Sequence, residues 1–289
     1  MPRRFDHCVL CVRDLERAAQ TFVALGFTLT PIGQLPFGVS NRVALFGDAF
    51  LELLAVPDPA AVPPHAPGQF SFGAHNQAFL TEGEGMSMLA WHSSDARGDA
   101  RRFNADGCGA YAPFDFGRDV VLPSGERARF NFSLAFATDP AMPRIAFFVC
   151  QQRHPPELFW RPQYQHHPNG TQRIAEIVLS AAEPGRHRTF LERICEGIAE
   201  ELSGGFTVQT DGGRLTLLDP TEAARRFGGS PGESRPRFCA VRLEVADLAA
   251  VAQLLRSNRI EAIGRGGGLL VPATQAHGLA LEFVSKGAS

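Results

Sequence analysis

The spacing of hydrophobic positions changes from a strand period to a helix period and back, and this change repeats along the chain. Residues 5–12 alternate as a strand, and Asp14 then caps a helical run that Gly26 ends. Apolar residues lie at helical spacing within that run, at positions 15, 18, 19, 22 and 23. Three further strands are expected at 27–31, 41–46 and 50–56. The pattern predicts a β-α-β-β-β module.

The same order of elements recurs three more times, which indicates an internal repeat. The four predicted modules cover residues 1–56, 86–154, 171–220 and 236–289. A boundary near residue 155 divides the chain into halves, residues 1–154 and 155–289. Two segments fall outside the modules. Residues 57–85 are rich in Pro, Ala and Gly and are predicted to be a functional lid or disordered, and residues 221–237 to be a mobile connector.

Composition excludes several classes of protein. The chain has 28 basic and 30 acidic residues and is 44% hydrophobic, so we expect no nucleic-acid partner and no membrane partner. Its only lysine is Lys286, which excludes Schiff-base chemistry elsewhere in the chain. The six cysteines and the absence of a signal-peptide pattern at the N-terminus predict free thiols in a cytoplasmic protein. The oligomeric state is left open, with a homodimer as one alternative.

Two sequence runs carry a family resemblance. The run FDHCVLCVRDLERAAQTFVALGF, with His7 in its strand and Glu52 in FLELL, resembles the opening module of the vicinal oxygen chelate superfamily. That superfamily includes glyoxalase I, bleomycin-resistance proteins and extradiol dioxygenases. The run ELFWRPQYQHHPNG is similar to an uncharacterised glyoxalase-like branch of it. The resemblance implies an α+β fold in which repeated β-α-β-β-β modules form half-open curved sheets around a cavity.

The resemblance also implies a divalent metal, held from the first and last strands of each module. His7 and Glu52 stand at those places in the first module, and an imidazole with a carboxylate suits Zn, Ni, Mn or Fe. The alternative for the pair is a hydrogen-bonded core histidine and a solvent-facing glutamate. In module two, the residue seven positions before the helix cap, as His7 is in module one, is Met88. Its last strand puts Phe147 or Phe148 near the position of Glu52. Module two therefore offers no matching ligand.

Three other residues are candidates for completing the metal site, namely Glu176, Glu282 and His92. Which of them contributes depends on which modules pair. If modules one and four pair, Glu282 joins His7 and Glu52, whereas if modules one and two pair, only His92 is near enough to be considered. The sequence leaves both pairings open.

The segment between the halves is the second candidate for chemistry. It combines large aromatics, imidazoles and a Pro-Asn-Gly turn, which is typical of a ligand-contacting loop. The predicted substrate-binding residues are Trp160, His167 and Asn169, and the alternative is a structural strap in which Trp160 fills the core. Asp115 and Arg118 are also candidates for polar contacts, although a surface ion pair between them is the favoured interpretation.

The sequence therefore predicts two competing functions. The first is a glyoxalase-like, metal-dependent lyase, isomerase or dioxygenase acting on a small organic molecule. The second is a metal-free binding or resistance protein of the bleomycin-resistance type, which sequesters an apolar compound in a cavity lined by some of the 23 phenylalanines. The metal content of the purified protein distinguishes these two functions.

Overall fold

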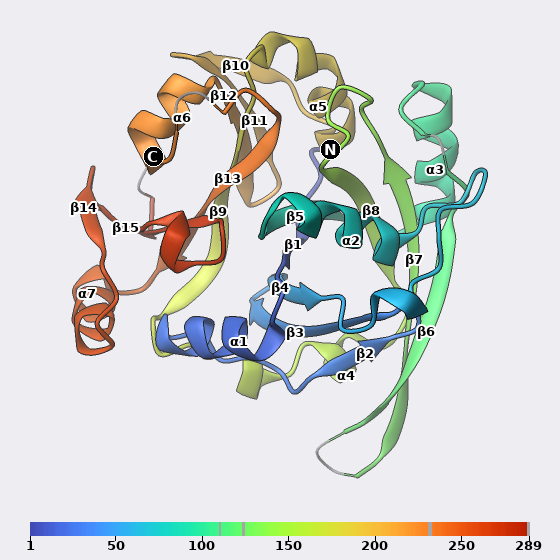
Figure 1. The fold of residues 1–289 in the computed structure, drawn as a ribbon, viewed down its shortest axis with the longest axis horizontal. Coiled ribbons are helices and arrows are strands. Elements are labelled where there is room, and N and C mark those ends of the chain that lie inside the picture. Colours follow the sequence, from blue (N-terminus) through green and yellow to red (C-terminus); the bar gives the residue numbers. More distant parts are fainter. Residues whose placement is uncertain (110, 123–124, 231–232, 288–289) are drawn as a thin grey trace.

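The computed structural model describes residues 1–109, 111–122, 125–230 and 233–287, and the strands of this part form two curved eight-stranded sheets (Figure 1). The first sheet has the order β2-β3-β4-β1-β5-β8-β7-β6. Its strands are β1 (Phe5–Cys11), β2 (Gly33–Leu35), β3 (Val39–Phe46), β4 (Ala49–Ala55), β5 (Gly85–His92), β6 (Phe114–Val121), β7 (Arg127–Ala137) and β8 (Ala146–Gln152).

The second sheet repeats this arrangement with the order β10-β11-β12-β9-β13-β16-β15-β14. Its strands are β9 (Thr171–Ser180), β10 (Ala199–Leu202), β11 (Gly205–Thr210), β12 (Gly213–Leu218), β13 (Arg237–Val245), β14 (Ile263–Arg265), β15 (Gly268–Val271) and β16 (Ala280–Ser285). The α+β fold of repeated modules is thereby confirmed.

Each module contributes one helix after its first strand, as the periodicity predicts. These helices are α1 (Leu15–Ala24), α3 (Ala96–Ala105), α5 (Arg188–Cys195) and α7 (Leu248–Ser257). Asp14, Asp95 and Asp247 cap three of them by accepting backbone N–H groups of the first turn. The remaining helices are α2 (Phe72–Glu82), α4 (Pro156–Phe159) and α6 (Pro220–Phe227), with short 3₁₀ turns at Pro59–Ala61, Pro162–Tyr164, Pro184–His187 and Ala273–Gln275.

Strand pairing shows which modules combine. β1 pairs antiparallel with β5 and parallel with β4, so modules one and two share the first sheet. β9 and β13 are related in the same way, so modules three and four share the second. In both sheets the two first strands lie at the centre and each is flanked by the last strand of its own module. This order brings side chains of first and last strands together.

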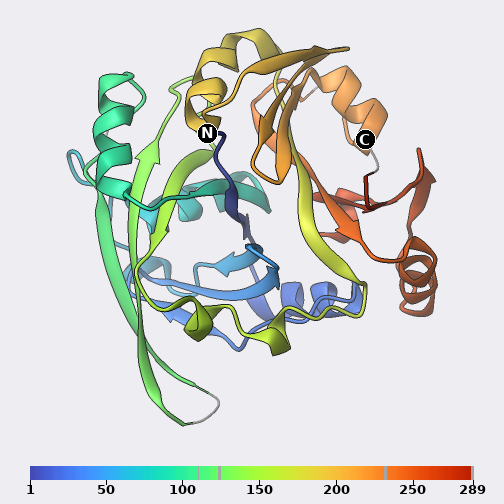
Figure 2. The ribbon, with the colours of Figure 1, turned by 180° about the vertical axis from the view of Figure 1, so that it is seen from behind.

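The two sheets pack against each other through a continuous hydrophobic core. One cluster of buried side chains runs from Phe5 in the first sheet to Phe283 in the second. The N-terminal segment lies between the sheets beside α5 in both views, where the Arg3 amide donates to the Cys195 carbonyl at 2.8 Å (Figure 2). The segment between β8 and β9, which contains α4, lies along the first half of the molecule before the chain enters β9.

Several predicted boundaries are wrong. Residues 27–31 form no strand, and Pro31, which has no N–H to donate, interrupts that segment. The segment 57–85 is not disordered, because it contains α2, capped by Ser71 and buried through Phe72 and Phe79. The predicted connector 221–237 includes most of α6, although its residues 231–232 lie outside the described part. No helix in the described residues is long and apolar enough to cross a bilayer.

Candidate functional site

A β-bulge at the start of β1 places two neighbouring side chains together. Phe5 pairs with Trp91 and His7 with Ala90, so Asp6 is an extra residue in the ladder. Successive side chains of a regular strand point to opposite faces, but a bulge can re-aim one of them. The Asp6 carboxylate consequently reaches the His7 ring, with Oδ1 2.5 Å from Nδ1, and both side chains are buried.

His7 and Glu52 converge in one cavity. The Nε2 atom of His7 lies 3.7 Å from Oε2 of Glu52, and both residues are about 5% exposed. The other carboxylate oxygen of Glu52 accepts a hydrogen bond from Asn41 Nδ2 at 2.5 Å. Phe50 stacks on the His7 ring with centroids 4.3 Å apart. The geometry therefore rules out the solvent-facing glutamate that the sequence left as an alternative.

Strand register brings one residue of module two into the cavity beside His7. His7 pairs with Phe50 across β1 and β4, and Glu52 lies two residues after that partner. In module two, Ala90 pairs with Phe148, and Cys150 lies two residues after it. Cys150 therefore lies on the cavity-facing side of β8, as Glu52 does on β4. Met88, seven residues before the Asp95 cap, pairs with Ala146, and Phe148 is two residues after that partner, so these two residues fit the counting from the helix caps and neither offers a metal ligand.

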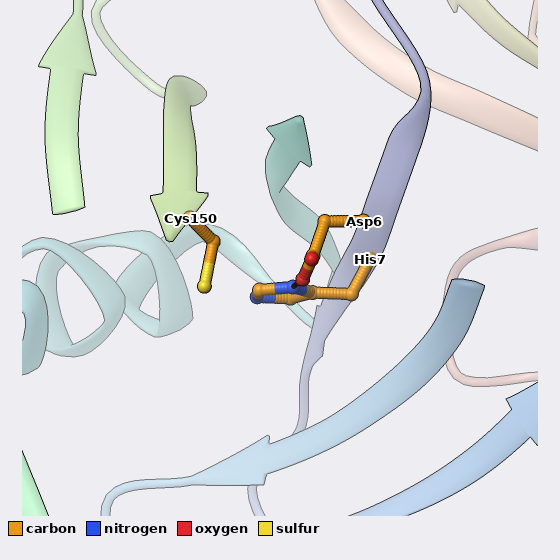
Figure 3. A group of neighbouring side chains, drawn as sticks. All are labelled: Asp6, His7 and Cys150. Atoms are coloured by element: carbon orange, nitrogen blue, oxygen red, sulfur yellow. Dashed lines mark hydrogen bonds and ion pairs between the residues drawn. The ribbon is translucent and has the colours of Figure 1, made fainter. Parts of the chain in front are cut away.

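Cys150 consequently belongs to the site, and the sequence reasoning missed it. Its side chain points toward the His7 ring (Figure 3), and ligand atoms of Asp6, His7 and Cys150 all lie within 4.8 Å of one another. Burial raises the pKa of the Cys150 thiol well above its usual value, and the negative charges of Asp6 and Glu52 add to that shift. The thiol is therefore protonated in the metal-free protein.

Trp160 supports the site from behind the histidine. Its Nε1 donates to Gln152 Oε1 at 3.2 Å, and Gln152 Nε2 donates to Asp6 Oδ2 at 3.1 Å. A chain of hydrogen bonds thus leads from Trp160 through Gln152 and Asp6 to His7. The Trp160 ring also contacts Phe50 edge-on, with centroids 5.9 Å apart. Trp160, which the sequence predicts to bind substrate, uses its indole N–H on Gln152 and orients other side chains.

The cavity around His7 is narrow and mostly aromatic. Its volume is about 50 Å³, and its polar lining comes from His7, Asn41, Glu52, Cys150 and Arg118. The phenylalanines that line it are Phe37, Phe50, Phe72, Phe116, Phe132, Phe148 and Phe159. A larger pocket of about 490 Å³ adjoins it and shares Val43, Arg118 and Phe159 with it. Together they form an inner cavity and an outer pocket.

The predicted ion pair between Asp115 and Arg118 is wrong. Successive pairs along the β6–β7 hairpin put Asp115 opposite Ser133 and Arg118 opposite Phe130. Asp115 instead pairs with Arg97 and Arg153 at the surface. Arg118 lies between the inner cavity and the outer pocket, where burial lowers the pKa of its guanidinium while the charge of Glu52 opposes that shift.

His167 and Asn169 lie outside the residues that line either pocket. His167 Nδ1 accepts the Thr28 amide at 3.0 Å, and its Nε2 donates to the Leu45 carbonyl at 2.8 Å. Asn169 donates to the Leu25 carbonyl and accepts the Thr171 amide. Both side chains are buried and their polar atoms are already used. They form the structural strap, so this geometry does not support substrate binding by His167 and Asn169.

The other predicted ligands are also distant from His7. His92 is exposed at the end of β5 and lines a different pocket near the N-terminus. Glu176 accepts hydrogen bonds from Arg214, Arg242 and Thr216, and Glu282 pairs with the same Arg242 at 2.6 Å. Both glutamates therefore belong to a buried ion-pair network of the second sheet. Neither they nor His92 completes a site with His7.

The six cysteines are unpaired and buried, as the sequence predicts. Cys8 and Cys11 form a CxxC spacing, and burial raises the pKa of both thiols. Cys8 points away from the His7 cavity, because only Cys150 among the cysteines lines that space in the described residues. The CxxC pair therefore packs the core.

Two curved sheets of paired modules, with a buried imidazole on a central strand of the first sheet and a carboxylate on the strand beside it, define a protein of the vicinal oxygen chelate class. A family model described as a glyoxalase-like domain matches residues 5–195. The chain therefore belongs to the glyoxalase-like domain family of that superfamily. A comparison with curated proteins finds no match.

Solved structures share the fold at low sequence identity. A hypothetical protein from Staphylococcus aureus aligns with a TM-score of 0.71 and 13% identity, covering 98% of this chain and 99% of its own. An Mn(II)-bound glyoxalase from Novosphingobium aromaticivorans aligns with a TM-score of 0.56 and 13% identity, covering 99% of this chain and 82% of its own. Homoprotocatechuate 2,3-dioxygenase from Arthrobacter globiformis aligns with a TM-score of 0.56 and 13% identity, covering 99% of this chain and 80% of its own.

Proposed function

We propose that the protein is a metal-dependent enzyme of the glyoxalase-like type, a lyase, isomerase or dioxygenase, that acts on a small organic molecule in the His7 cavity. The observation that carries this proposal is the orientation of the His7 ring. Asp6 holds Nδ1 at 2.5 Å, and Nε2 is directed toward the Glu52 carboxylate. A carboxylate behind a histidine is the usual support of a metal-ligating imidazole.

The donor set fits a divalent metal. One nitrogen of His7 and one oxygen of Glu52, 3.7 Å apart, can bind the same ion, since metal–ligand distances are about 2.1 Å. The Cys150 thiol, whose sulfur lies within 4.8 Å of ligand atoms of His7 and Asp6, is a further candidate donor, and Ala90, which faces His7 across the central strands, leaves room for substrate. A thiolate beside an imidazole and a carboxylate favours Zn or Fe over Mn. The Mn(II)-bound glyoxalase among the structural relatives supports a divalent metal in general.

The remaining residues shape the chemistry of the cavity. A bound divalent ion would polarise a substrate oxygen. Asn41 fixes the Glu52 carboxylate by its 2.5 Å hydrogen bond, so that the second oxygen stays directed at His7. The phenylalanine walls exclude water, which strengthens electrostatic interactions inside the cavity. All six cysteines are free thiols, as is usual in the cytoplasm, and we place the enzyme there.

A specific observation favours a second candidate function, a metal-free binding protein for an apolar compound. Among the described residues, module two lines the cavity with no histidine or carboxylate, and its one candidate donor there is a protonated Cys150. The Phe-rich lining alone would retain an apolar molecule. Such a binding protein would hold its ligand in the same cavity and catalyse no reaction.

Metal binding decides between the two. The protein, treated with chelator and then titrated separately with Zn, Ni, Mn and Fe(II), should melt at a higher temperature with at least one of them, because binding to the folded state alone stabilises it by about 2.7 kcal/mol at a hundredfold excess over Kd. His7→Gln should lose that shift. His92→Gln is the matched control, because His92 is exposed and lines a different pocket. If no metal raises the melting temperature of the unmodified protein, the binding-protein function is the better account.

A further inference from the structure

Arg118 has no partner for its charge. In the described part of the chain, no carboxylate lies within ion-pair distance of its guanidinium and no acceptor is hydrogen-bonded to it. The side chain is partly buried, and it lies over the ring of its cross-strand neighbour Phe130 at 5.5 Å. None of its nitrogens is among the fully buried, unpartnered atoms of the described residues, so the guanidinium remains accessible to a carboxylate or phosphate, the groups it normally pairs with.

The fold leaves space for the Arg118 guanidinium at Gly33, which has no side chain. A Cβ added at Gly33 would collide with Nη1 of Arg118 and with Oδ1 of Asn41. Gly33 is in the edge strand β2, which thus comes close to Arg118 only because residue 33 has no side chain. Asn41 in turn binds Glu52. The unpaired charge is therefore built into the wall next to the proposed reaction site.

We propose that Arg118 binds a carboxylate group of the substrate at the passage between the inner cavity and the outer pocket. The inference rests on the proposed function, because it takes the His7 cavity as the place where substrate reacts. The outer pocket, at about 490 Å³, has the size of a small-molecule site, whereas the inner cavity of about 50 Å³ accepts only a small group. The substrate class is thus a small acid with an apolar body.

The rest of the outer pocket fits this ligand. Its apolar wall includes Ile32, Val43, Val120 and Leu158, which would contact the body of the acid. Arg161 adds a second guanidinium, whose only hydrogen bond within the described residues is from Nε to the Leu158 carbonyl. The acidic residue in the lining, Asp119, is exposed and paired with Arg129. The positive charge of Arg118 and Arg161 is therefore available to an anion.

The test compares acids with their uncharged amides. The probes are phenylacetate, 3-phenylpropionate and 4-phenylbutyrate with the corresponding amides, titrated by calorimetry into the full chain. We expect at least one acid to bind at least about tenfold more tightly than its amide, the usual size of a charge-assisted hydrogen bond. Arg118→Gln should remove that preference and leave amide binding unchanged. Arg127→Gln is the matched control, because Arg127 is exposed on the adjacent strand and lines neither pocket.

Titrations are run with chelator present and again with the metal that raises the melting temperature. A preference that persists in chelator and disappears in Arg118→Gln supports the proposal, even if the protein binds no metal. A preference that needs metal and is lost in His7→Gln but kept in Arg118→Gln overturns it, because the acid then binds the metal. Equal affinity for acids and amides, or no binding of any acid, also overturns it. Arg118→Lys, which keeps a positive charge, should retain part of the preference and covers the case in which the glutamine variant does not fold.

Discussion

Glu176 holds in the second sheet the position that His7 holds in the first. His7 faces Ala90 across the two central strands, and Glu176 faces Arg242 in the same way. Ala90 leaves the His7 ring open to the cavity, whereas Arg242 donates to the Glu176 carboxylate at 2.8 Å. Because the guanidinium takes the place that a ligand or metal would need, the proposed chemistry belongs to the first sheet, and the corresponding place in the second holds a buried ion pair.

The first prediction concerns the bulge residue. Asp6→Asn should weaken metal binding about 10- to 100-fold, because the amide no longer orients the His7 ring as a charged acceptor does. The melting temperature of the metal-free protein should change little. Calorimetric titration with the metal that stabilises the unmodified protein measures the effect. Unchanged affinity in folded Asp6→Asn would show that Asp6 does not support a metal ligand.

Cys150→Ala tests the third donor. If the Cys150 thiolate binds the ion, this variant should bind Zn at least about tenfold more weakly, while Mn binding changes less because Mn prefers oxygen ligands. Cys239→Ala is the control, since Cys239 is also buried but lies in the separate small cluster of the second sheet. Equal losses of Zn affinity in both variants would assign the effect to packing.

The third prediction concerns the ion-pair network of the second sheet. Burial raises the pKa of Glu176, but hydrogen bonds from Arg214, Arg242 and Thr216 outweigh it and hold the pKa below its usual value. Glu176→Gln should lower the free energy of unfolding by about 3 kcal/mol, because buried guanidiniums lose their partner. Urea unfolding at neutral pH measures it, with the exposed Glu200→Gln as a near-neutral control. A loss below about 0.5 kcal/mol would contradict a buried pair.

His75 should make stability depend on pH in mild acid. Burial lowers the pKa of His75 to about 4 from its usual 6.5, partly opposed by its hydrogen bond to the Ser87 backbone. The unfolded chain therefore binds a proton that the folded one does not, and stability is lost as pH falls from about 6.5 toward 4. We expect a contribution of roughly 1–3 kcal/mol over that range. Unfolding of His75→Leu should show a correspondingly smaller loss, and parallel curves for the two proteins would rule the effect out.

Gly33→Ala tests the close approach of β2 to Arg118. The added methyl collides with the ends of flexible side chains, so the protein should fold with a small loss of stability. The Arg118 guanidinium must move, and the preference for acids over amides should fall several-fold. Gly264→Ala is the control, since nothing lies within 4 Å of a Cβ there. The same preference in both variants would show that the position of Arg118 is not critical.

The alternation of residues was enough to predict the repeated modules, and the resemblance to the vicinal oxygen chelate superfamily then singled out His7 and Glu52. Both residues sit on strands whose inward faces are apolar, and their places at the first and last strand of one module follow from local order. Helix caps such as Asp14 and Asp95 act within one turn, so they too could be identified without the fold.

Long-range register decided the rest of the site. Cys150 is an ordinary cysteine in an apolar strand until β8 pairs with β5 and brings it to His7. Asp6 would point away from His7 in a regular strand, and only the bulge against β5 turns it inward. The sequence favoured a surface ion pair for Arg118, because its neighbours in sequence are polar. Only the register of the β6–β7 hairpin places it between the two pockets. Such contacts join residues far apart in the chain, so local periodicity carries no signal for them, and tertiary packing alone determines them.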